Sequence, residues 1–553
     1  MVRRPLAACA LLLAIYAGMS LLNDPRAYLG TDTGGKVATL KVMTKRGRLD
    51  PDIGYWAERW DPAGRVHPLY YTAHYGRRWV NATTLPVLYA AYPLYQLGGY
   101  RLVLLLPMLG SVLAALAARA LARRLSGSDG WVAFWLVGLA SPMLVYALDF
   151  WEHSIGVAAV AWGVVLLLDV VEDRRGWPAF LGAGALFGLA ATVRTEALVY
   201  GFVAVAGACL GALLWRRNVA LAVGGGVLAV VGLLVPLLAN MALELATVGE
   251  PIRFSRAAGT ASGAVSGLAS GAGEASSVAG TRVQEALLNA AALNPLLEPL
   301  SSLVGFTVLG LLVFVVWRTS RHGEVGPAVL AAVGVGALYA IRFADGPGFV
   351  PGLVGATPLV AVGLVLGWRT RPGRWVLGVA LVSLPLVWAT QFPGGATPQW
   401  AGRYLLVSGL LAGVTGIVSL PALRPWARNS VVGLAVVVTA FGALWMSIRT
   451  HDVARALAAL NGRPEPVLVS RVGHLAREGG VFYGEHRWLT APTDADQRFA
   501  VHVLEQAGVT RFGLVFLSVE APKTPVAGWR NVGSDELELV DGLMLRVTTY
   551  EAR

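Results

Sequence analysis

Long apolar runs separated by short polar turns fill most of the chain, and they constrain its fold more than any other feature. A transmembrane helix needs about 20 predominantly apolar residues to cross a bilayer. Runs of roughly that length lie at 6–22, 101–121, 131–148, 154–171, 178–193, 197–214, 219–241, 301–317, 327–343, 351–367, 375–391, 404–420 and 430–448. The sequence therefore predicts an α-helical polytopic membrane protein with about thirteen transmembrane helices. The shorter apolar run Leu85–Leu97 is expected to form an interfacial or re-entrant helix.

The composition agrees with a membrane protein and excludes several other classes. Of the 553 residues, 56% are hydrophobic and only 14% are charged, which is far too apolar for an ordinary soluble enzyme. A net charge of +12 can indicate a nucleic-acid partner. Here the arginines form short clusters between apolar runs, so no nucleic acid is expected. Cys9 and Cys209 lie inside apolar runs, so the sequence indicates neither a disulfide framework nor a cysteine metal site.

Arginine clusters fall on alternate turns, which predicts the orientation of the chain in the membrane. If the N-terminus is cytoplasmic, the cytoplasmic turns are the basic ones, at 123–124, 174–175, 216–217, 318–321, 369–374 and 424–428. The other turns, at 149–153, 194–196, 342–345 and 399–403, are mixed or acidic. Because cytoplasmic loops are enriched in Lys and Arg, we expect a multi-pass protein of the plasma (inner) membrane with a cytoplasmic N-terminus. An odd number of helices places the C-terminal tail on the extracytoplasmic side.

Two parts of the chain depart from the membrane pattern. Within a transmembrane domain of residues 1–448, the segment 22–99 is predicted as a long first external loop. Residues 449–553 change composition and are expected to form a small extracytoplasmic α/β domain. Three strands are predicted in it, at 467–470, 481–483 and 512–517. One helix is predicted, at 498–507. A Gly/Ala/Ser-rich stretch, Arg256–Gly280, is expected to be a mobile external loop.

The first loop begins with an acid beside the membrane. Asp32 lies just beyond the first apolar run, where it can act on a lipid headgroup, and Lys36 follows it as a candidate cavity residue. The nearby pair Asp50-Pro51-Asp52 has the spacing of a cation site, but we favour turn chemistry for it. His67 and His74 lie in an aromatic run whose tyrosines suit a membrane-interface belt. We treat both histidines as candidates for lining the substrate cavity.

Three further turns place ionisable residues on the same side as Asp32. Such residues at a membrane edge are costly and usually functional. The candidates are Asp149, Glu152 and His153, then Arg194 and Glu196, then Arg403. Arg194 and Arg403 suit a phosphate clamp because guanidinium matches phosphate geometry. The alternatives are a polar turn for Asp149, a helix-pinning ion pair for Arg194 and Glu196, and an ordinary interfacial residue for Arg403.

These segments, in this order, resemble a known family. The segments that carry the resemblance are 31–33, 76–80, Pro86, 92–95, 141–153, 188–197 and 400–405. They are similar to segments of the GT-C superfamily of integral-membrane glycosyltransferases, which includes protein O-mannosyltransferases and aminoarabinose transferases. The resemblance covers about Leu6 to Leu420, and it implies that Asp32 is the catalytic acid residue of the first external loop. Thr33 stands where many relatives carry a second acid, which weakens any analogy to a metal centre.

The resemblance implies a sugar donor carried on a polyprenyl phosphate and a hydroxyl acceptor from a glycolipid, a cell-envelope glycan or a protein. Asp32 would act as general base. Arg194, Arg403 and Glu196 would hold the donor phosphate, and Glu152 and His153 would orient donor or acceptor. No cofactor is expected, with a divalent cation left as an open alternative. A hexosyl- or pentosyltransferase is thus the predicted activity.

Two other functions compete with glycosyl transfer. A transporter or lipid-linked-sugar flippase would also place charges inside a polytopic bundle. Neither paired halves nor broken helices, which are common in transporters, is evident in the sequence. A noncatalytic assembly protein is the third alternative, and it is favoured only if the external tail is the working part.

Overall fold

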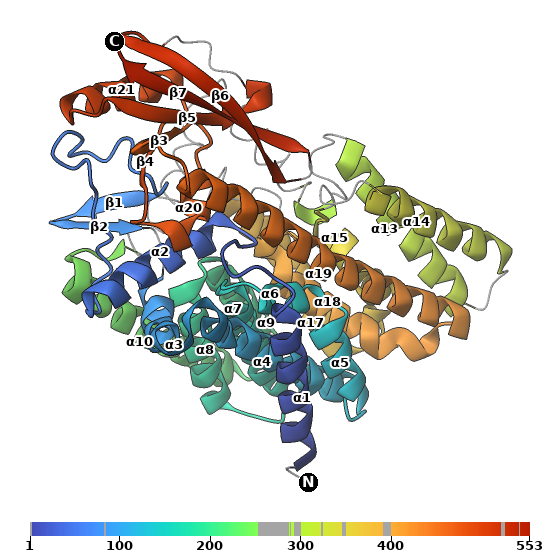
Figure 1. Cartoon of the computed structure of the whole chain (residues 1–553). Helices are drawn as coiled ribbons and strands as arrows, with labels where there is room; N and C mark the ends of the chain where they lie inside the picture. Colours follow the sequence, from blue (N-terminus) through green and yellow to red (C-terminus); the bar gives the residue numbers. More distant parts are fainter. Residues whose placement is uncertain are drawn as a thin grey trace, which may run out of the picture.

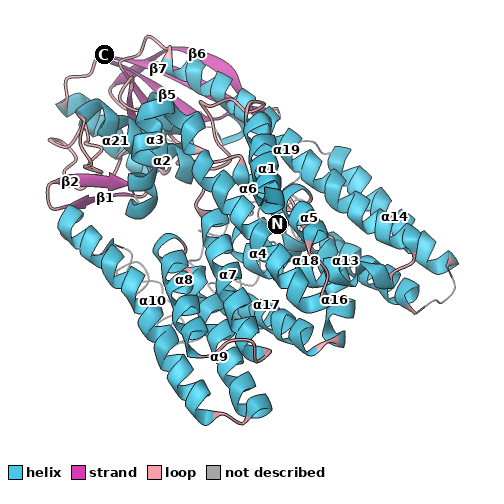
Figure 2. Ribbon diagram, turned by 90° about the horizontal axis from the view of Figure 1, so that it is seen from below, coloured by secondary structure: helices cyan, strands magenta, loops and turns pink. Residues whose placement is uncertain are grey.

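The computed structural model describes residues 3–81, 84–252, 287, 289–291, 300–321, 325–344, 350–390, 400–520, 526–540 and 542–553. Its two ends lie far apart: helices fill the N-terminal side of the molecule, and the strands of the C-terminal sheet gather at the opposite end (Figures 1 and 2). The Gly/Ala/Ser-rich stretch predicted as a mobile loop, 256–280, lies outside the described residues.

Nine helices of the described residues are long and apolar enough to cross a membrane. They are α4 (Leu105–Ser126), α7 (His153–Val171), α9 (Glu196–Arg216), α10 (Val219–Val248), α13 (Leu300–Ser320), α14 (Gly326–Ala344), α17 (Arg371–Thr390), α18 (Leu406–Ser419, preceded by the short helix η3, Arg403–Leu405) and α19 (Pro425–Asn461). Three predicted runs form shorter apolar helices, α1 (Arg3–Ser20), α8 (Trp177–Val193) and α16 (Leu359–Leu366). The prediction of a polytopic α-helical membrane protein is therefore confirmed.

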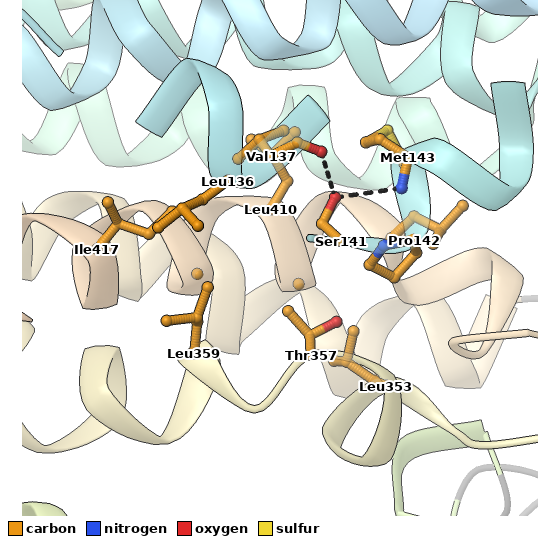
Figure 3. A pocket seen from close by; sticks show the side chains of 13 residues that line it. Leu136, Val137, Ser141, Pro142, Met143, Leu353, Thr357, Leu359, Leu410 and Ile417 are labelled. Atoms are coloured by element: carbon orange, nitrogen blue, oxygen red, sulfur yellow. Dashed lines mark hydrogen bonds between the residues drawn. The ribbon is translucent and has the colours of Figure 1, made fainter. Parts of the chain in front are cut away.

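Two of the apolar runs are broken rather than continuous, which the hydropathy pattern does not reveal. The broken pairs are α5 (Trp131–Leu139) with α6 (Pro142–Ala147), and α15 (Leu353–Ala356) with α16. Each break precedes a proline, Pro142 or Pro358, whose ring and missing N–H disfavour a continuous helix. At the first break the Ser141 hydroxyl donates to the Val137 carbonyl and accepts from the Met143 amide (Figure 3).

A small apolar cavity of about 20 Å³ lies between the two broken helices and α18. Its only hydroxyl-bearing side chains are Ser141 and Thr357, and no charged side chain lines it. The Thr357 hydroxyl is buried without a hydrogen-bond partner among the described residues. The cavity therefore provides tight apolar packing between helices and no group that would bind an ion.

The predicted first loop is a folded structure. It contains α2 (Thr31–Arg46), the antiparallel strands β1 (Thr72–Tyr75) and β2 (Arg78–Asn81), and α3 (Leu85–Val103). The helix expected at 85–97 is present, but it continues past a kink at Gly98 and Gly99 to the start of α4. The turn predicted at Asp50-Pro51-Asp52 is confirmed, since the Asp52 amide donates to the Asp50 carboxylate at 3.2 Å.

A five-stranded mixed sheet forms the C-terminal unit. Its strands are β3 (Val467–Ser470), β4 (Arg487–Thr490), β5 (Arg511–Leu517), β6 (Trp529–Val540) and β7 (Leu543–Ala552), in the order β4-β3-β5-β7-β6. Helix α21 (Asp494–Gln506) confirms the predicted helix, and β3 and β5 confirm two predicted strands. The third predicted strand is wrong, because residues Gly480–Phe482 form a 3-10 helix, η5. The boundary at 449 stays a prediction; helix α19 runs through it to Asn461.

The first loop and the C-terminal sheet share one hydrophobic core. Successive side chains of a strand point to opposite faces, and Phe512, Leu514 and Phe516 of β5 pack with α21 and with loop residues such as Tyr55 and Trp79. On the other face, Val515 packs against the end of α19. At the sheet edge, the Thr490 amide donates to the Val66 carbonyl at 3.0 Å. Ala38 of α2 belongs to the same core, which holds α2 against the C-terminal unit.

Candidate active site

Helix α2 carries the predicted acid in its first turn. Gly30 precedes it in an extended conformation, and Asp32 lies where the positive end of the helix dipole favours a carboxylate. The following glycines allow close packing, because a Cβ on Gly34 would lie 2.0 Å from the carbonyl oxygen of Arg477. A Cβ on Gly35 would lie 2.3 Å from the Asn81 amide oxygen. The contact at Gly34 is with fixed backbone and requires glycine, whereas at Gly35 the neighbours are side chains of Asn81 and Arg477.

Asp32 lies between two arginines that come from distant parts of the chain. Arg477 of helix α20 (Leu475–Glu478) donates from Nη1 to Asp32 Oδ1 at 2.9 Å, and Arg403 Nη1 lies 3.4 Å from Oδ2. Burial alone would raise the pKa of Asp32, but the charges of Arg477 and Arg403 outweigh it and hold that pKa well below its ordinary value. The Asp32 side chain keeps 37% of its surface exposed, so a substrate can reach the ionised carboxylate.

Helix α2 also contacts the turn before α7, through Lys36, which lies one helical turn after Asp32, and through Thr33. Lys36 forms an ion pair with Glu152, and both side chains are buried. One turn earlier, the Thr33 hydroxyl donates to Asp149 Oδ2 at 2.9 Å, and Tyr100 donates to Asp149 Oδ1 at 2.7 Å. Because buried carboxylates need partners, these contacts fix α2 over the membrane helices.

Arg194 continues the network into the helix bundle. It follows the end of α8, where its Nε donates to Glu196 Oε1 at 2.8 Å and its Nη1 lies 3.5 Å from Glu152 Oε1. The guanidinium also lies 5.0 Å from the centre of the Tyr404 ring. The structure therefore contains the ion pair between Arg194 and Glu196 that the helix-pinning alternative requires. The bridge to Glu152 extends that pair into a larger cluster.

Arg403, the first residue of the short helix η3 before α18, completes the cluster. Its guanidinium lies over the rings of Tyr404 and Trp151, at 4.8 and 6.0 Å from their centres, and its Nη2 donates to the Tyr404 hydroxyl at 3.2 Å. Arg403 Nε, the Trp151 indole nitrogen and both ring nitrogens of His153 are buried without hydrogen-bond partners among the described residues. Most buried polar groups in proteins are paired, so unpaired nitrogens gathered in one place point to a ligand.

A small internal cavity of about 10 Å³ lies beside these unpaired groups. Its polar lining comes from five side chains, His153, Arg194, Glu196, Arg403 and Tyr404. The space is about that of a single water molecule. A phosphate group could therefore enter this place only if the surrounding side chains moved apart.

The structure brings eight predicted residues into one charged cluster. They are Asp32, Lys36, Asp149, Glu152, His153, Arg194, Glu196 and Arg403. His153 is connected through its ring contact with Trp151, whose centre lies 4.8 Å away. Sequence reasoning missed Arg477, Tyr100 and Asn81. Arg477 has no local signal, because it lies in the C-terminal unit, outside the segments that resemble the GT-C superfamily.

The two candidate histidines of the first loop lie elsewhere. The rings of His67 and His74 both stack with the Trp79 ring, with ring centres 5.4 and 4.5 Å from that of Trp79. His67 is buried, and its ring also bonds to the backbone of Gly54 and Leu69. In the structure both rings pack against Trp79 within the loop, and neither lines the small cavity beside Arg194. Their expected place in the substrate cavity stays a prediction.

Among the described residues, no group of three or more His, Cys, Asp or Glu side chains is arranged to hold a metal ion. The carboxylates of the cluster are instead paired with arginine, lysine or hydroxyl groups. The expectation that no cofactor is needed stays a prediction.

Comparison with known proteins gives matches only in structure. No family model matches the sequence, and no curated protein matches it. The chain is similar to apo ArnT from Cupriavidus metallidurans, with 14% identity and a TM-score of 0.49 over 98% of this chain and 97% of that chain. ArnT bound to undecaprenyl phosphate gives 13% identity and a TM-score of 0.47 over the same shares of the two chains.

A second similar structure is the oligosaccharyltransferase AglB from Archaeoglobus fulgidus, solved with an inhibitory peptide and a dolichol-phosphate. It gives 12% identity and a TM-score of 0.42, over 92% of this chain and 69% of that chain. Identities this low do not show which side chains react, so the function is inferred below from the site itself.

Proposed function

We propose that this protein is a membrane glycosyltransferase that moves a sugar from a polyprenyl-phosphate donor to an acceptor hydroxyl, with Asp32 as general base. The observation that carries the proposal is the position of Asp32 between Arg403 and Arg477, with Arg194 in the same cluster. The cluster lies where the apolar helices meet the loop and the C-terminal unit. A lipid phosphate at the membrane surface would find cations there, and its chain would remain among apolar helices.

The residues divide the reaction between them. The acceptor oxygen forms a bond to the anomeric carbon of the donor sugar as the bond from that carbon to the phosphate oxygen breaks. Asp32 accepts the proton of the acceptor hydroxyl. Arg403 and Arg194 stabilise the negative charge on the departing lipid phosphate, since guanidinium groups bind phosphate oxygens in a planar, bidentate manner.

The resting contacts suggest how donor binding prepares the base. Arg403 is the weaker partner of Asp32, at 3.4 Å, and its Nε has no acceptor among the described residues. A donor phosphate would compete with Asp32 for this guanidinium. Losing part of that positive charge would raise the pKa of Asp32, so the carboxylate would become a better base once the donor is bound.

The remaining cluster residues would position the substrates. Lys36 and Glu152 form a buried ion pair next to α2, and Glu196 holds Arg194 from the other side. His153 has two unpaired ring nitrogens in the cavity beside Arg194, which suits contact with a sugar hydroxyl or a phosphate oxygen. Asp149 holds the hydroxyls of Thr33 and Tyr100, so its role would be to orient α2.

The broken helices favour a transporter as the second candidate, because discontinuous helices often form transporter binding sites. In such sites, helix ends and unwound backbone meet an ion or a polar substrate. Here the cavity at the breaks has an apolar lining with two hydroxyls and no charge. A cluster of charged groups lies instead beside α2, where Asp32, Arg403 and Arg194 come together, which favours transfer chemistry.

Replacement of Asp32 tests the proposal. Asp32→Asn keeps the size of the side chain but cannot accept a proton, so we expect transfer to fall by about 10²-fold or more. The full chain in proteoliposomes would be given undecaprenyl-phosphate hexoses and pentoses with a cell-envelope extract as acceptor. Binding of undecaprenyl phosphate should survive, because the arginines are proposed to hold it.

Asp50→Asn and Asp52→Asn are the matched controls. Both acids shape a turn in the same loop and bind Arg78 and Arg46, so their replacement should leave transfer within a few-fold of the starting rate. Near-normal turnover in the Asp32 variant would remove the general base from the mechanism.

A further inference from the structure

A third cavity, larger than the two described above, lies at the junction of the first loop and the C-terminal unit. Its volume is about 370 Å³, within the usual range for sites that bind small molecules. The aromatic side chains Trp56, Phe482, Tyr483 and Trp488 line it. Polar side chains accompany them, chiefly Glu485 and Arg487.

The aromatic rings of this cavity are held in place by hydrogen bonds at their polar ends. The Trp56 indole nitrogen donates to the Trp488 carbonyl at 2.9 Å, and the Tyr483 hydroxyl donates to the Gly54 carbonyl at 2.9 Å. The Arg487 guanidinium lies 5.4 Å from the centre of the Trp56 ring. Because the polar atoms of Trp56 and Tyr483 are engaged, these side chains offer mainly their apolar surfaces to a ligand.

This combination of groups suits one class of ligand. The C–H face of a pyranose ring stacks on an indole or phenol ring, while its hydroxyl groups at the edge bond to carboxylate, amide and guanidinium groups. Glu485 and Arg487 are both exposed at the cavity and carry opposite charges, so they favour a neutral polyhydroxylated ligand over an anion. Glu485 is ion-paired with Lys41 of α2, but about half of its side-chain surface stays exposed, so its carboxylate can still accept from a ligand hydroxyl.

We propose that this cavity binds a neutral saccharide, the carbohydrate part of the acceptor. That the saccharide belongs to the acceptor rests on the proposed glycosyl transfer. Saccharide binding by the cavity does not depend on that function. The acceptor would therefore be a glycolipid or a glycan with at least one sugar unit beyond the one that reacts.

The wall of the cavity connects it to Asp32. Ala476 and Gly479, in and just after the short helix α20, line the cavity, and Arg477 lies between them in sequence. The Arg477 side chain reaches the opposite way, to Asp32 and to Asn81. A saccharide in the cavity would thus contact the same short helix that holds the proposed base, on the side away from the donor.

Direct binding measurements test the saccharide site. Isothermal titration of the detergent-solubilised full chain with maltotriose, mannotriose and cellotriose should show saturable binding of at least one of them. Trp56→Ala removes a stacking surface and Glu485→Ala removes a hydroxyl acceptor, and each should weaken that binding at least tenfold. The matched controls are Trp60→Ala, in the same loop, and Glu520→Ala, in the same C-terminal unit; neither residue lines the cavity, and both should change affinity less than twofold.

The outcomes separate this proposal from the proposed function. If no trisaccharide binds to a protein that still binds undecaprenyl phosphate, the saccharide site is overturned. Equal loss of affinity in the control variants would also overturn it, since the effect would then be general. If trisaccharides bind as expected but Asp32→Asn leaves transfer unchanged, the saccharide site stands and the general-base proposal fails.

Discussion

Arg477 Nη1 lies 2.9 Å from Asp32 Oδ1, although 445 positions separate the two residues in the sequence. The Arg477 side chain is almost fully buried, with 2% of its surface exposed, and its Nε and Nη2 are bound by Asn81 Oδ1. A buried arginine with this many fixed contacts cannot turn away from the carboxylate without leaving charge unpaired. The C-terminal unit therefore sets the environment of the proposed base.

Removal of this arginine should change the pH dependence of transfer. Arg477→Gln keeps a long polar side chain but loses the charge that lowers the pKa of Asp32, so that pKa should rise. A general base works only when ionised, so the acidic limb of the profile of kcat against pH should move to higher pH. A merely structural role would lower kcat at every pH and leave the limb in place.

The ion pairs of Asp32 with Arg477 and Arg403 should also make the free energy of unfolding depend on pH. The pKa of Asp32 is lower in the folded protein than its ordinary value, so ionised Asp32 stabilises the fold above that ordinary value and loses this contribution as the pH falls through the folded pKa. In the Arg477→Gln variant the folded pKa of Asp32 is higher, so this contribution should be smaller and its loss should be complete at a higher pH. Thermal unfolding at several acidic pH values checks the direction of the shift.

Arg194 is expected to hold the donor phosphate. Arg194→Lys keeps the charge but loses the planar fork, so affinity for undecaprenyl phosphate should fall about tenfold, comparable to one charge-assisted hydrogen bond. Expression and the melting temperature should hold. The control is Arg124→Lys, which alters a similar arginine paired with the buried Asp169. Loss of folding with unchanged phosphate affinity would support the helix-pinning alternative instead.

The apolar pattern of the sequence was sufficient to place the helices, because crossing a bilayer demands long apolar segments whatever the tertiary contacts are. It could not show that two of them break. Pro142 and Pro358 carry that signal, but a hydropathy window averages over a single proline. Strand β6 gives no apolar signal either, since it is mostly exposed and carries charged residues such as Asp535 and Glu536.

In the site, too, residues that stand out in their local sequence could be predicted, whereas contacts between distant parts of the chain could not. Asp32, Arg194 and Arg403 lie beside membrane helices, where charge is conspicuous, so the sequence indicated them. Arg477 lies in a polar region rich in arginine, and only the docking of the C-terminal unit on α2 reveals its contact. The aromatic run around His67 gives no such indication, since its tyrosines suit an interface belt, and only the folded loop shows that the His67 ring packs against Trp79.

The docking of the C-terminal unit should depend on the absence of a side chain at Gly34. A Cβ there would lie 2.0 Å from the Arg477 carbonyl oxygen and 3.0 Å from the Glu478 carbonyl oxygen, both backbone atoms that cannot rotate away. Gly34→Ala should therefore destabilise the protein by about 1–3 kcal/mol, the usual cost of overpacking, and should reduce transfer. In Gly433→Ala, where the new Cβ meets nothing within 4 Å, transfer should be unchanged and stability should hold or rise slightly, because alanine is the better helix former. Equal melting temperatures for the two variants would contradict the close contact between α2 and α20.

The orientation of the chain can be tested at two exposed serines on opposite sides of the molecule. Ser126 is the last residue of α4, in a turn predicted to be cytoplasmic, and Ser534 lies on β6 of the C-terminal sheet, which Figure 1 shows at the end of the molecule opposite to the N-terminus. Because basic turns face the cytoplasm, a cysteine at 534 should react with an impermeant maleimide in intact cells, and a cysteine at 126 should react only after permeabilisation. Cys9 and Cys209 would first be replaced by alanine, since they are the only native cysteines. Labelling of both sites from the same side would rule out an odd number of membrane crossings between residues 126 and 534. Labelling in the reverse order would place the proposed active site, and with it the acceptor, on the cytoplasmic face.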